Sequence, residues 1–318
     1  MAVNILIKPD NKQSGKFGLK SIFGKNTNKT LTFAGLQKIV GAGFVYGHRN
    51  RIGYVFDEFK GDDIINADIV LYNPKRIGRG IIVCVLENGN IEVILNVPCT
   101  AQDAKEYFYI VKKICTHYKL NEFVMDDERL VTLDELDELT DSIILWNNNI
   151  LRQYLEQMKD QIFMIFGGNN PIAIEEDVRD LLLTLGNVEL EKAFADYIND
   201  KQQMDVYHMN PRFYQDNEGI FGVYTITETV DSVIPMKPYM PFNSGLGDDA
   251  KMDDIKKWIV SFVIIDGEKY DVAGYIKYDD LIDNLPQSKL TKYDASNYIM
   301  QGLNRNEINN LLKNQITL

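Results

Sequence analysis

The stretch that most constrains the fold of this chain is residues 80–120, which has the pattern of two strands, a tight turn and a helix. Apolar runs at 80–87 and 90–97 flank Asn88 and Gly89, a pair that favours the positive φ angles of a two-residue hairpin turn. Such a turn sets Leu86 opposite Ile91 and gives the hairpin one apolar, buried face. The residues predicted on that face are Ile82, Cys84, Leu86, Ile91, Val93 and Leu95.

A helix is predicted directly after this hairpin. Thr100 is a favourable N-cap residue, and the apolar residues behind it recur at helical spacing, so one side of the helix can lie on the hairpin. These apolar residues are Tyr107, Phe108, Val111, Ile114, Cys115 and Tyr118. A second hairpin is predicted at 258–276, around Asp266 and Gly267, with helical segments at 278–285 and 294–300.

The part of the chain between these two hairpins has mostly helical patterns. Apolar residues recur at helical spacing over 150–166, 175–185 and 188–198. The sequence therefore predicts an α+β fold of antiparallel β-hairpins packed with helices, and a mostly helical middle segment. We expect a β-rich α+β domain with a basic N-terminal segment over 1–128, a helical segment over 129–205, and a C-terminal β-hairpin with helices over 206–318.

The charge is unevenly distributed along the chain. The net charge is −12, yet residues 1–60 contain ten Lys or Arg against three Asp or Glu. This basic segment either docks on the acidic remainder or forms an anion-binding surface. The acidic total disfavours nucleic acid as a partner, and no apolar run is long enough for a signal peptide or a membrane span. The cysteines have no paired spacing, so a cytoplasmic location is expected.

Two basic, glycine-containing loops at 47–51 and 75–80 are candidate binding sites. Guanidinium groups and backbone N–H groups there can together hold a phosphate or a carboxylate of a ligand or partner. The same composition is also typical of ordinary solvated turns. The candidate binding residues are His48, Arg49, Arg51, Lys75, Arg76 and Arg79.

Residues 235–242 are a second candidate contact. Proline occurs there at every third position, which is the period of a polyproline II helix that an aromatic groove of a partner can bind. A stiff connection between two parts of the fold explains the same pattern. The residues expected to contact a partner are Pro235, Pro238, Tyr239 and Pro241.

The sequence predicts no catalytic residue, no cofactor and no metal site. Cys115 and His117 are two apart on a predicted helix, so their side chains point in different directions and do not readily share a metal. The acidic clusters lack the spacing of a calcium loop. Cys84 and Cys115 fall on predicted core faces, where a thiol behaves as a small apolar group.

Residues 73–80 followed by the hairpin, and the stretches 278–286 and 302–303, resemble a bacterial family of low-GC Gram-positive bacteria that is defined by a domain of unknown function, DUF4299. The resemblance extends to both ends of the chain. It implies no activity, substrate or site, because the function of the family is itself unassigned.

Three functional interpretations follow. The first is an uncharacterised cytoplasmic protein that acts without catalysis by binding a macromolecule, with a protein as the candidate partner. The second is a small-molecule-binding or hydrolytic enzyme whose anion site is lined by Arg49, Arg51, Arg76 and Arg79. The third is single-strand nucleic-acid binding through Phe17, Phe23 and Tyr46, which the acidic total disfavours. The sequence leaves the oligomeric state open.

Overall fold

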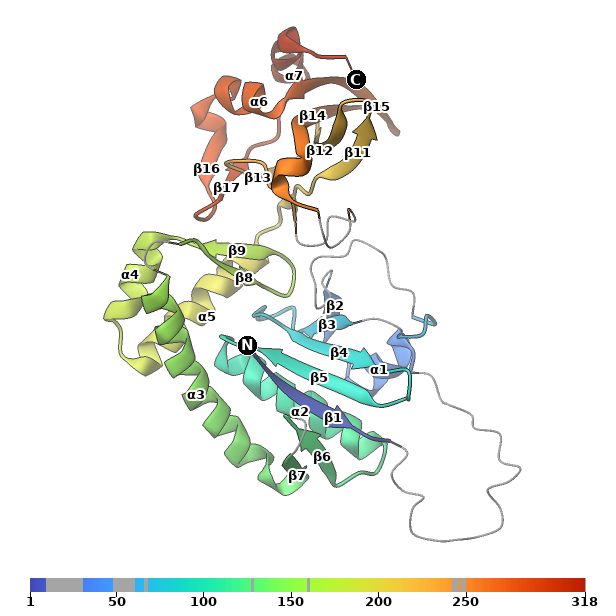
Figure 1. Ribbon diagram of the computed structural model, residues 1–318, viewed down its shortest axis with the longest axis vertical. Helices are drawn as coiled ribbons and strands as arrows, with labels where there is room; N and C mark the ends of the chain where they lie inside the picture. Colours follow the sequence, from blue (N-terminus) through green and yellow to red (C-terminus); the bar gives the residue numbers. More distant parts are fainter. Residues whose placement is uncertain are drawn as a thin grey trace, which may run out of the picture. The chain divides into compact units, whose positions relative to one another are not determined.

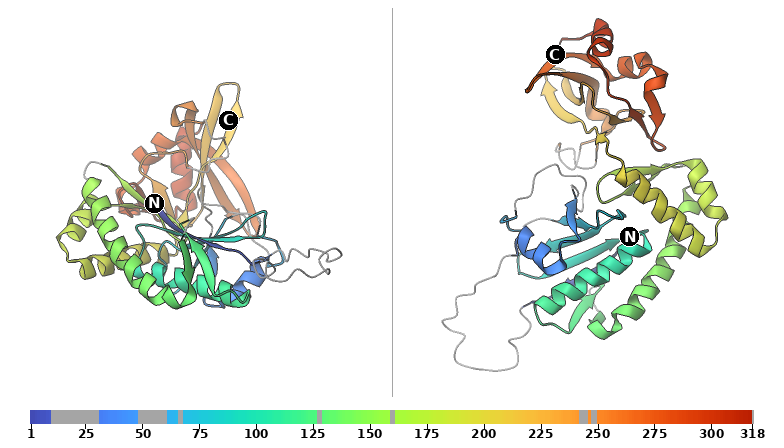
Figure 2. Two further views of the ribbon diagram at one scale, coloured as in Figure 1. Left: turned by 60° about the horizontal axis from the view of Figure 1, so that its bottom comes forward. Right: turned by 180° about the vertical axis from the view of Figure 1, so that it is seen from behind.

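The computed structural model describes residues 1–9, 31–47, 61–65, 68–126, 129–158, 161–241, 246 and 250–317. The chain divides into two compact units (Figures 1 and 2). The first unit contains Met1–Ile172 and Asp177–Gln203. The second contains Ala173–Glu176 and Met204–Leu318.

The first unit is built on a sheet of seven strands in the order β2-β3-β4-β5-β1-β6-β7. All neighbouring strands in this sheet are antiparallel. The strands are β1 (Ala2–Ile7), β2 (Val45–Gly47), β3 (Ile69–Tyr72), β4 (Ile81–Val85), β5 (Ile91–Asn96), β6 (Glu122–Met125) and β7 (Arg129–Thr132).

Helix α2 (Ala101–His117) lies across one face of this sheet (Figure 1). Its N-cap is Thr100, as the sequence predicts, and Tyr107, Ile110 and Ile114 are completely buried between helix and strands. The remaining elements of this part of the chain are α1 (Phe33–Val40), the 3₁₀ turn Leu133–Glu135, α3 (Leu136–Gln157), β8 (Phe163–Phe166), β9 (Pro171–Ile174), α4 (Glu176–Thr184) and α5 (Asn187–Gln203).

The register of the β4–β5 hairpin differs from the prediction by one residue. Val85 pairs with Ile91, whereas a two-residue turn would pair Leu86 with Ile91. The turn contains three residues, 87–89, which is one more than in a two-residue turn. Gly89 takes a φ of 80°, the positive value that such three-residue hairpin loops require. Ile82 therefore lies on the face opposite Ile91, in a small cluster with Val70 and Ile94, and Cys84 is only partly buried.

The second unit contains two four-stranded sheets, ordered β10-β13-β17-β16 and β11-β12-β14-β15. Tyr224, Phe262 and Leu281 are completely buried in its core. Its elements are β10 (Tyr207–His208), β11 (Arg212–Asp216), β12 (Gly219–Thr227), β13 (Ser232–Pro235), the 3₁₀ turn Met252–Asp254, β14 (Ile255–Asp266), β15 (Lys269–Lys277), α6 (Tyr278–Asn284), the 3₁₀ turn Gln287–Lys289, β16 (Leu290–Lys292), β17 (Asn297–Met300), α7 (Arg305–Leu311) and the 3₁₀ turn Leu312–Asn314.

The α+β class and the hairpin at 258–276 are confirmed, whereas two predicted helical segments are wrong. Helix α3 ends at Gln157, and Phe163–Phe166 is a strand whose side chains alternate between buried and exposed positions. Asn297–Met300 is also a strand, paired with β13 and β16. Both errors involve short apolar runs, in which periodicity alone does not distinguish a strand from a helix.

Candidate functional site

The loop that carries the predicted basic residues lies at the start of α2, where it binds a carboxylate of the chain itself. Asp103 is 2% exposed. Its carboxylate accepts hydrogen bonds from the backbone N–H groups of Arg79 at 3.1 Å and Gly80 at 3.0 Å, and from the N–H and hydroxyl of Thr100 at 2.9 and 2.8 Å. The N–H groups of Arg79 and Gly80 thus have an internal anionic partner.

The two glycines of this loop make room for Asp103. A Cβ atom on Gly78 would lie 2.3 Å from a carboxylate oxygen of Asp103, which is far closer than van der Waals contact. Gly80 has a φ of 72°, in the left-handed region that glycine adopts without strain. The glycines therefore serve the close approach of the loop to its own carboxylate.

The three described basic residues of the predicted site do not converge. The Arg79 side chain donates from Nε to the carbonyl of Phe166 at 3.2 Å and from Nη1 to the carbonyl of Pro98 at 2.9 Å. Arg76 is half exposed and forms a 3.5 Å ion pair with Asp196, and Lys75 is exposed. His48, Arg49 and Arg51 lie outside the described residues, so the predicted anion site remains a prediction for them.

Helix α5 also holds this loop, through side-chain hydrogen bonds to its backbone. Asn199 accepts a hydrogen bond from the backbone N–H of Ile77 at 2.9 Å, and the Gln203 side chain donates to the carbonyl of Pro74 at 2.8 Å. The Glu191 carboxylate accepts from the N–H of Ala101, the first residue of α2, at 2.8 Å. A negative side chain is favourable at a helix N-terminus.

A buried amide fixes the turn between β5 and α2. Asn147 of α3 is fully buried, and its side chain both accepts from the N–H and donates to the carbonyl of Cys99, each at 2.8 Å. Burial raises the pKa of the Cys99 thiol well above its usual value, and nearby Asp103 adds to this effect. A thiol that stays protonated is a poor nucleophile.

Sequence reasoning missed Asp103, Asn147 and Glu191. The Thr-x-x-Asp pattern at Thr100 and Asp103 is a readable capping signal, and the structure shows that reciprocal capping box. Asn147 and Glu191 have no local signal, because their partners lie 48 and 90 residues away.

Glu106 gives this cluster a pH-dependent group. The side chain is 6% exposed and accepts hydrogen bonds from Gln102 at 2.8 Å and Asn73 at 3.2 Å. Burial raises the pKa of Glu106 from 4.5 to about 6. The folded state therefore binds a proton more strongly than the unfolded state, and this group contributes stability at low pH that is lost as the pH rises from about 4.5 through 6.

Replacing Glu106 with glutamine is expected to stabilise the protein at pH 7, because the neutral amide keeps an acceptor without a buried charge. We expect the free energy of unfolding at pH 7 to rise by about 2 kcal/mol, since one pKa unit corresponds to roughly 1.4 kcal/mol. Urea unfolding of wild type and Glu106→Gln at pH 4 and pH 7 measures the difference. A gain of equal size at both pH values would contradict the assignment.

The described part of the predicted proline contact, residues 235–241, packs within the second unit. The carbonyl of Pro235, the last residue of β13, accepts a hydrogen bond from the Tyr278 hydroxyl at 2.5 Å. The backbone of Tyr239 exchanges two hydrogen bonds with the Tyr224 hydroxyl, both at 3.2 Å, and burial raises the pKa of Tyr239 to about 12. Pro238 and Pro241 are half-buried. Partner binding by this segment remains a prediction.

An exposed apolar patch lies on the β14–β15 hairpin. Val272 pairs with Val263, and Tyr270 pairs with Ile265, which places all four side chains on one face of the sheet. The exposed fraction is 69% for Tyr270 and 54% for Val272, and Val263 and Ile265 are partly exposed. We call these four residues the hairpin patch. The sequence predicts the hairpin but does not indicate that this face is uncovered.

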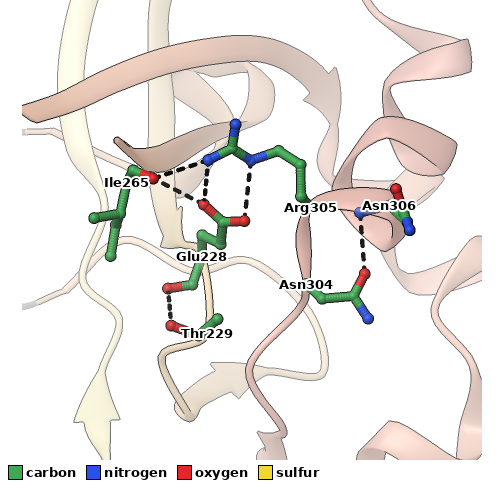
Figure 3. Close-up of polar contacts among 6 residues, drawn as sticks. All are labelled: Glu228, Thr229, Ile265, Asn304, Arg305 and Asn306. Carbon is green, nitrogen blue, oxygen red and sulfur yellow. Dashed lines mark hydrogen bonds and ion pairs between the residues drawn. The ribbon is translucent and has the colours of Figure 1, made fainter. Parts of the chain in front are cut away.

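An ion pair supports β14 close to the turn of this hairpin (Figure 3). Both carboxylate oxygens of Glu228 accept from the Arg305 guanidinium, at 3.0 and 2.7 Å. The same two side chains bind Ile265: its N–H donates to Glu228 at 3.0 Å, and its carbonyl accepts from Arg305 at 2.9 Å. Strand β12 ends at Thr227, so Glu228 and Arg305 replace the missing strand beside β14.

In the described ranges, no group of three or more His, Cys, Asp or Glu side chains is placed to hold a metal ion. None of the described helices combines the length and the apolar character needed to cross a membrane. Of the three aromatic residues in the nucleic-acid interpretation, Phe17 and Phe23 lie outside the described residues. The ring of Tyr46 packs edge-on against the ring of Phe33, with 5.1 Å between the ring centres.

A family model described as "Domain of unknown function (DUF4299)" matches residues 3–311, which is nearly the whole chain. Searches of curated proteins and of solved structures found no match.

Proposed function

The chain belongs to this family of unknown function, and we propose that it is a non-enzymatic protein of the cytoplasm that binds a protein partner through the β14–β15 hairpin. The observation that carries the proposal is the hairpin patch, in which Tyr270 and Val272 are more than half exposed beside Val263 and Ile265. Contiguous exposed apolar side chains are typical of interaction sites, whereas scattered ones are normal for any surface.

The polar cluster at the start of α2 supports binding over catalysis. The Arg79 guanidinium contacts two backbone carbonyls, and Asp103 occupies the N–H groups that a ligand anion would need. Arg79 is thus held in the fold and is not free to turn towards a substrate. The exposed pair Lys75 and Arg76 remains a predicted second contact, with an acidic region of the partner.

The cysteines support the proposed location. Two of the three cysteines, Cys99 and Cys115, are buried thiols that form no disulfide. Burial raises the pKa of Cys115 to about 12. Unpaired buried thiols suit the reducing cytoplasm, where disulfides are rare.

A pull-down from the lysate of the native host, with and without nuclease, tests the proposed function. The tagged wild-type chain is compared with a Tyr270→Ser, Val272→Thr double variant, which removes apolar surface and keeps β-forming or small residues. We expect the double variant to retain about tenfold less partner protein, because exposed aromatic anchors contribute strongly to interfaces.

Two further variants make this test specific. Tyr207→Ser changes a tyrosine that is 52% exposed elsewhere on the second unit, and we expect full retention of the partner. A Lys75→Ala, Arg76→Ala variant tests the basic contact and leaves Arg79 intact. Equal retention by wild type and the double variant contradicts the proposal, and capture that nuclease abolishes indicates a nucleic acid instead.

A further inference from the structure

Strand β15 is at the edge of its four-stranded sheet. Its second half is covered, because the N–H of Ile316 donates to the carbonyl of Tyr275 at 2.8 Å. Its first half, residues 269–273, pairs with β14 on one side and has no strand on its outer side in the described part of the chain. The open part of the edge is therefore the part that carries Tyr270 and Val272.

The hydrogen bonds of β14 show which way the backbone of this edge points. Ile265 uses its N–H and its carbonyl to bind Glu228 and Arg305, on the side away from β15 (Figure 3). The carbonyl of Val263 likewise accepts from the N–H of Glu228 at 2.8 Å. In an antiparallel pair, when the backbone N–H and carbonyl of one residue point away from the partner strand, those of the residue opposite it also point away from the pair, on the other side.

The N–H and carbonyl groups of Tyr270 and Val272, which pair with Ile265 and Val263, therefore point to the open edge. This edge presents two donors and two acceptors in the plane of the sheet. The side chains of the same two residues are exposed on one face of it. An uncovered strand with exposed apolar side chains is a template for another strand.

We propose that this edge binds an extended segment of the partner as an additional antiparallel strand. The segment has apolar residues opposite Tyr270 and Val272 and a lysine or arginine between them, opposite Asp271. This inference rests on the proposed function and specifies its partner. Main-chain hydrogen bonds provide the affinity in this mode of recognition, and alternate side chains provide the selectivity.

The charge around the hairpin selects a basic segment. Within residues 266–272, Asp266, Glu268 and Asp271 are exposed, against one exposed lysine, Lys269. The nearby Arg305 is paired with Glu228. The second unit as a whole contains nineteen Asp or Glu against eleven Lys or Arg. Opposite charges facing each other across two strands are stabilising, and like charges are destabilising.

The same charge disfavours a second copy of the chain as the occupant. Two copies can pair as antiparallel strands so that the outward-pointing N–H and carbonyl groups of both edges are all hydrogen-bonded. This arrangement pairs Tyr270 of one copy with Val272 of the other. That register sets Asp271 of one copy directly opposite Asp271 of the other, so two carboxylates would face each other. A partner strand with a basic residue at this position has no such repulsion.

Binding of a fluorescent probe peptide to the full wild-type chain tests the inference. The probe is Thr-Val-Lys-Val-Thr-amide with a fluorophore attached to its N-terminus, and its two valines would face Tyr270 and Val272. N-methylation of both valines removes the N–H groups that face the edge, and we expect affinity to fall about tenfold or more. N-methylation of the lysine, whose N–H points away from the edge, is the matched control and should change affinity far less.

A charge exchange tests the position of the basic residue. Replacing the probe lysine with glutamate should weaken binding to the wild-type chain, and Asp271→Lys should restore it for the glutamate probe. In the chain, Val272→Pro removes an edge N–H that no described residue uses, and Val272→Thr keeps it. We expect the proline variant alone to lose the probe.

The outcomes separate this inference from the proposed function. If the host partner depends on Tyr270 and Val272 but both N-methylated probes bind as well as the parent, strand addition is wrong and the proposed function stands. If the chain forms a dimer in sedimentation that Val272→Pro dissolves, a second copy is the occupant and the inference is overturned. If neither partner nor probe binds, both fail.

Discussion

Replacing Asp103 with alanine is expected to destabilise the first unit by about 4 kcal/mol. The carboxylate is the acceptor for three backbone N–H groups, those of Arg79, Gly80 and Thr100, and for the Thr100 hydroxyl. Alanine leaves these groups buried without this partner, and it also removes the capping box of α2. Because α2 covers the sheet, the whole unit should respond.

Tryptophan fluorescence can follow this effect in one unit at a time. Trp146 belongs to α3 and Trp258 to β14, and they are the two tryptophans of the chain. In a Trp258→Phe background, urea unfolding reports the first unit through Trp146. The control is Asp196→Ala, which removes one exposed ion pair and should cost less than about 0.5 kcal/mol. A loss below about 1 kcal/mol for Asp103→Ala would contradict the role of this carboxylate.

Replacing Gly302 with alanine is expected to destabilise the second unit by about 3 kcal/mol. A Cβ atom at this position would lie 2.3 Å from the carbonyl carbon of Thr229, which is rigid backbone. Thr229 already has a φ of 64°, and its N–H donates to the carbonyl of Leu303 at 2.9 Å. The turn at Thr229 must therefore shift to make room for the methyl group. Glu228 directly precedes Thr229, so we expect it to shift as well.

The displacement of Glu228 gives this prediction a second readout. Unfolding is followed through Trp258 in a Trp146→Phe background, and the control is Ser288→Ala, a change at an exposed position of the same unit. We expect Gly302→Ala also to weaken probe binding at the β15 edge, since Glu228 and Arg305 bind Ile265 of β14, close to the turn of that hairpin. An unchanged unfolding midpoint would show that the turn adapts without cost.

Much of the fold follows from local signals. The N-cap at Thr100 and the apolar spacing through Cys115 define α2, and both are confirmed. The Asn88-Gly89 and Asp266-Gly267 pairs correctly indicate hairpins, because glycine takes positive φ angles at low cost. These features depend on residues close together in the chain, so the sequence contains all the information that they need.

Register and burial required more than local signals. A loop of three residues in place of two moved Ile82 to the opposite face of the β4–β5 hairpin. The candidate site shows the same limit for Arg79. In sequence it resembles Arg76, yet it is 9% exposed and bound to carbonyls of Pro98 and Phe166, whereas Arg76 stays on the surface.

The sequence by itself determined the class of fold, the positions of the hairpins and of α2, and the family. Only the tertiary structure decided that Asp103 occupies the N–H groups of the basic loop and that the edge of β15 is uncovered. The physical reason is the range of the interactions. Caps and turns join neighbouring residues, whereas the partners of Asn147, Glu191 and Glu228 lie between 37 and 90 residues away and meet them only when the chain folds.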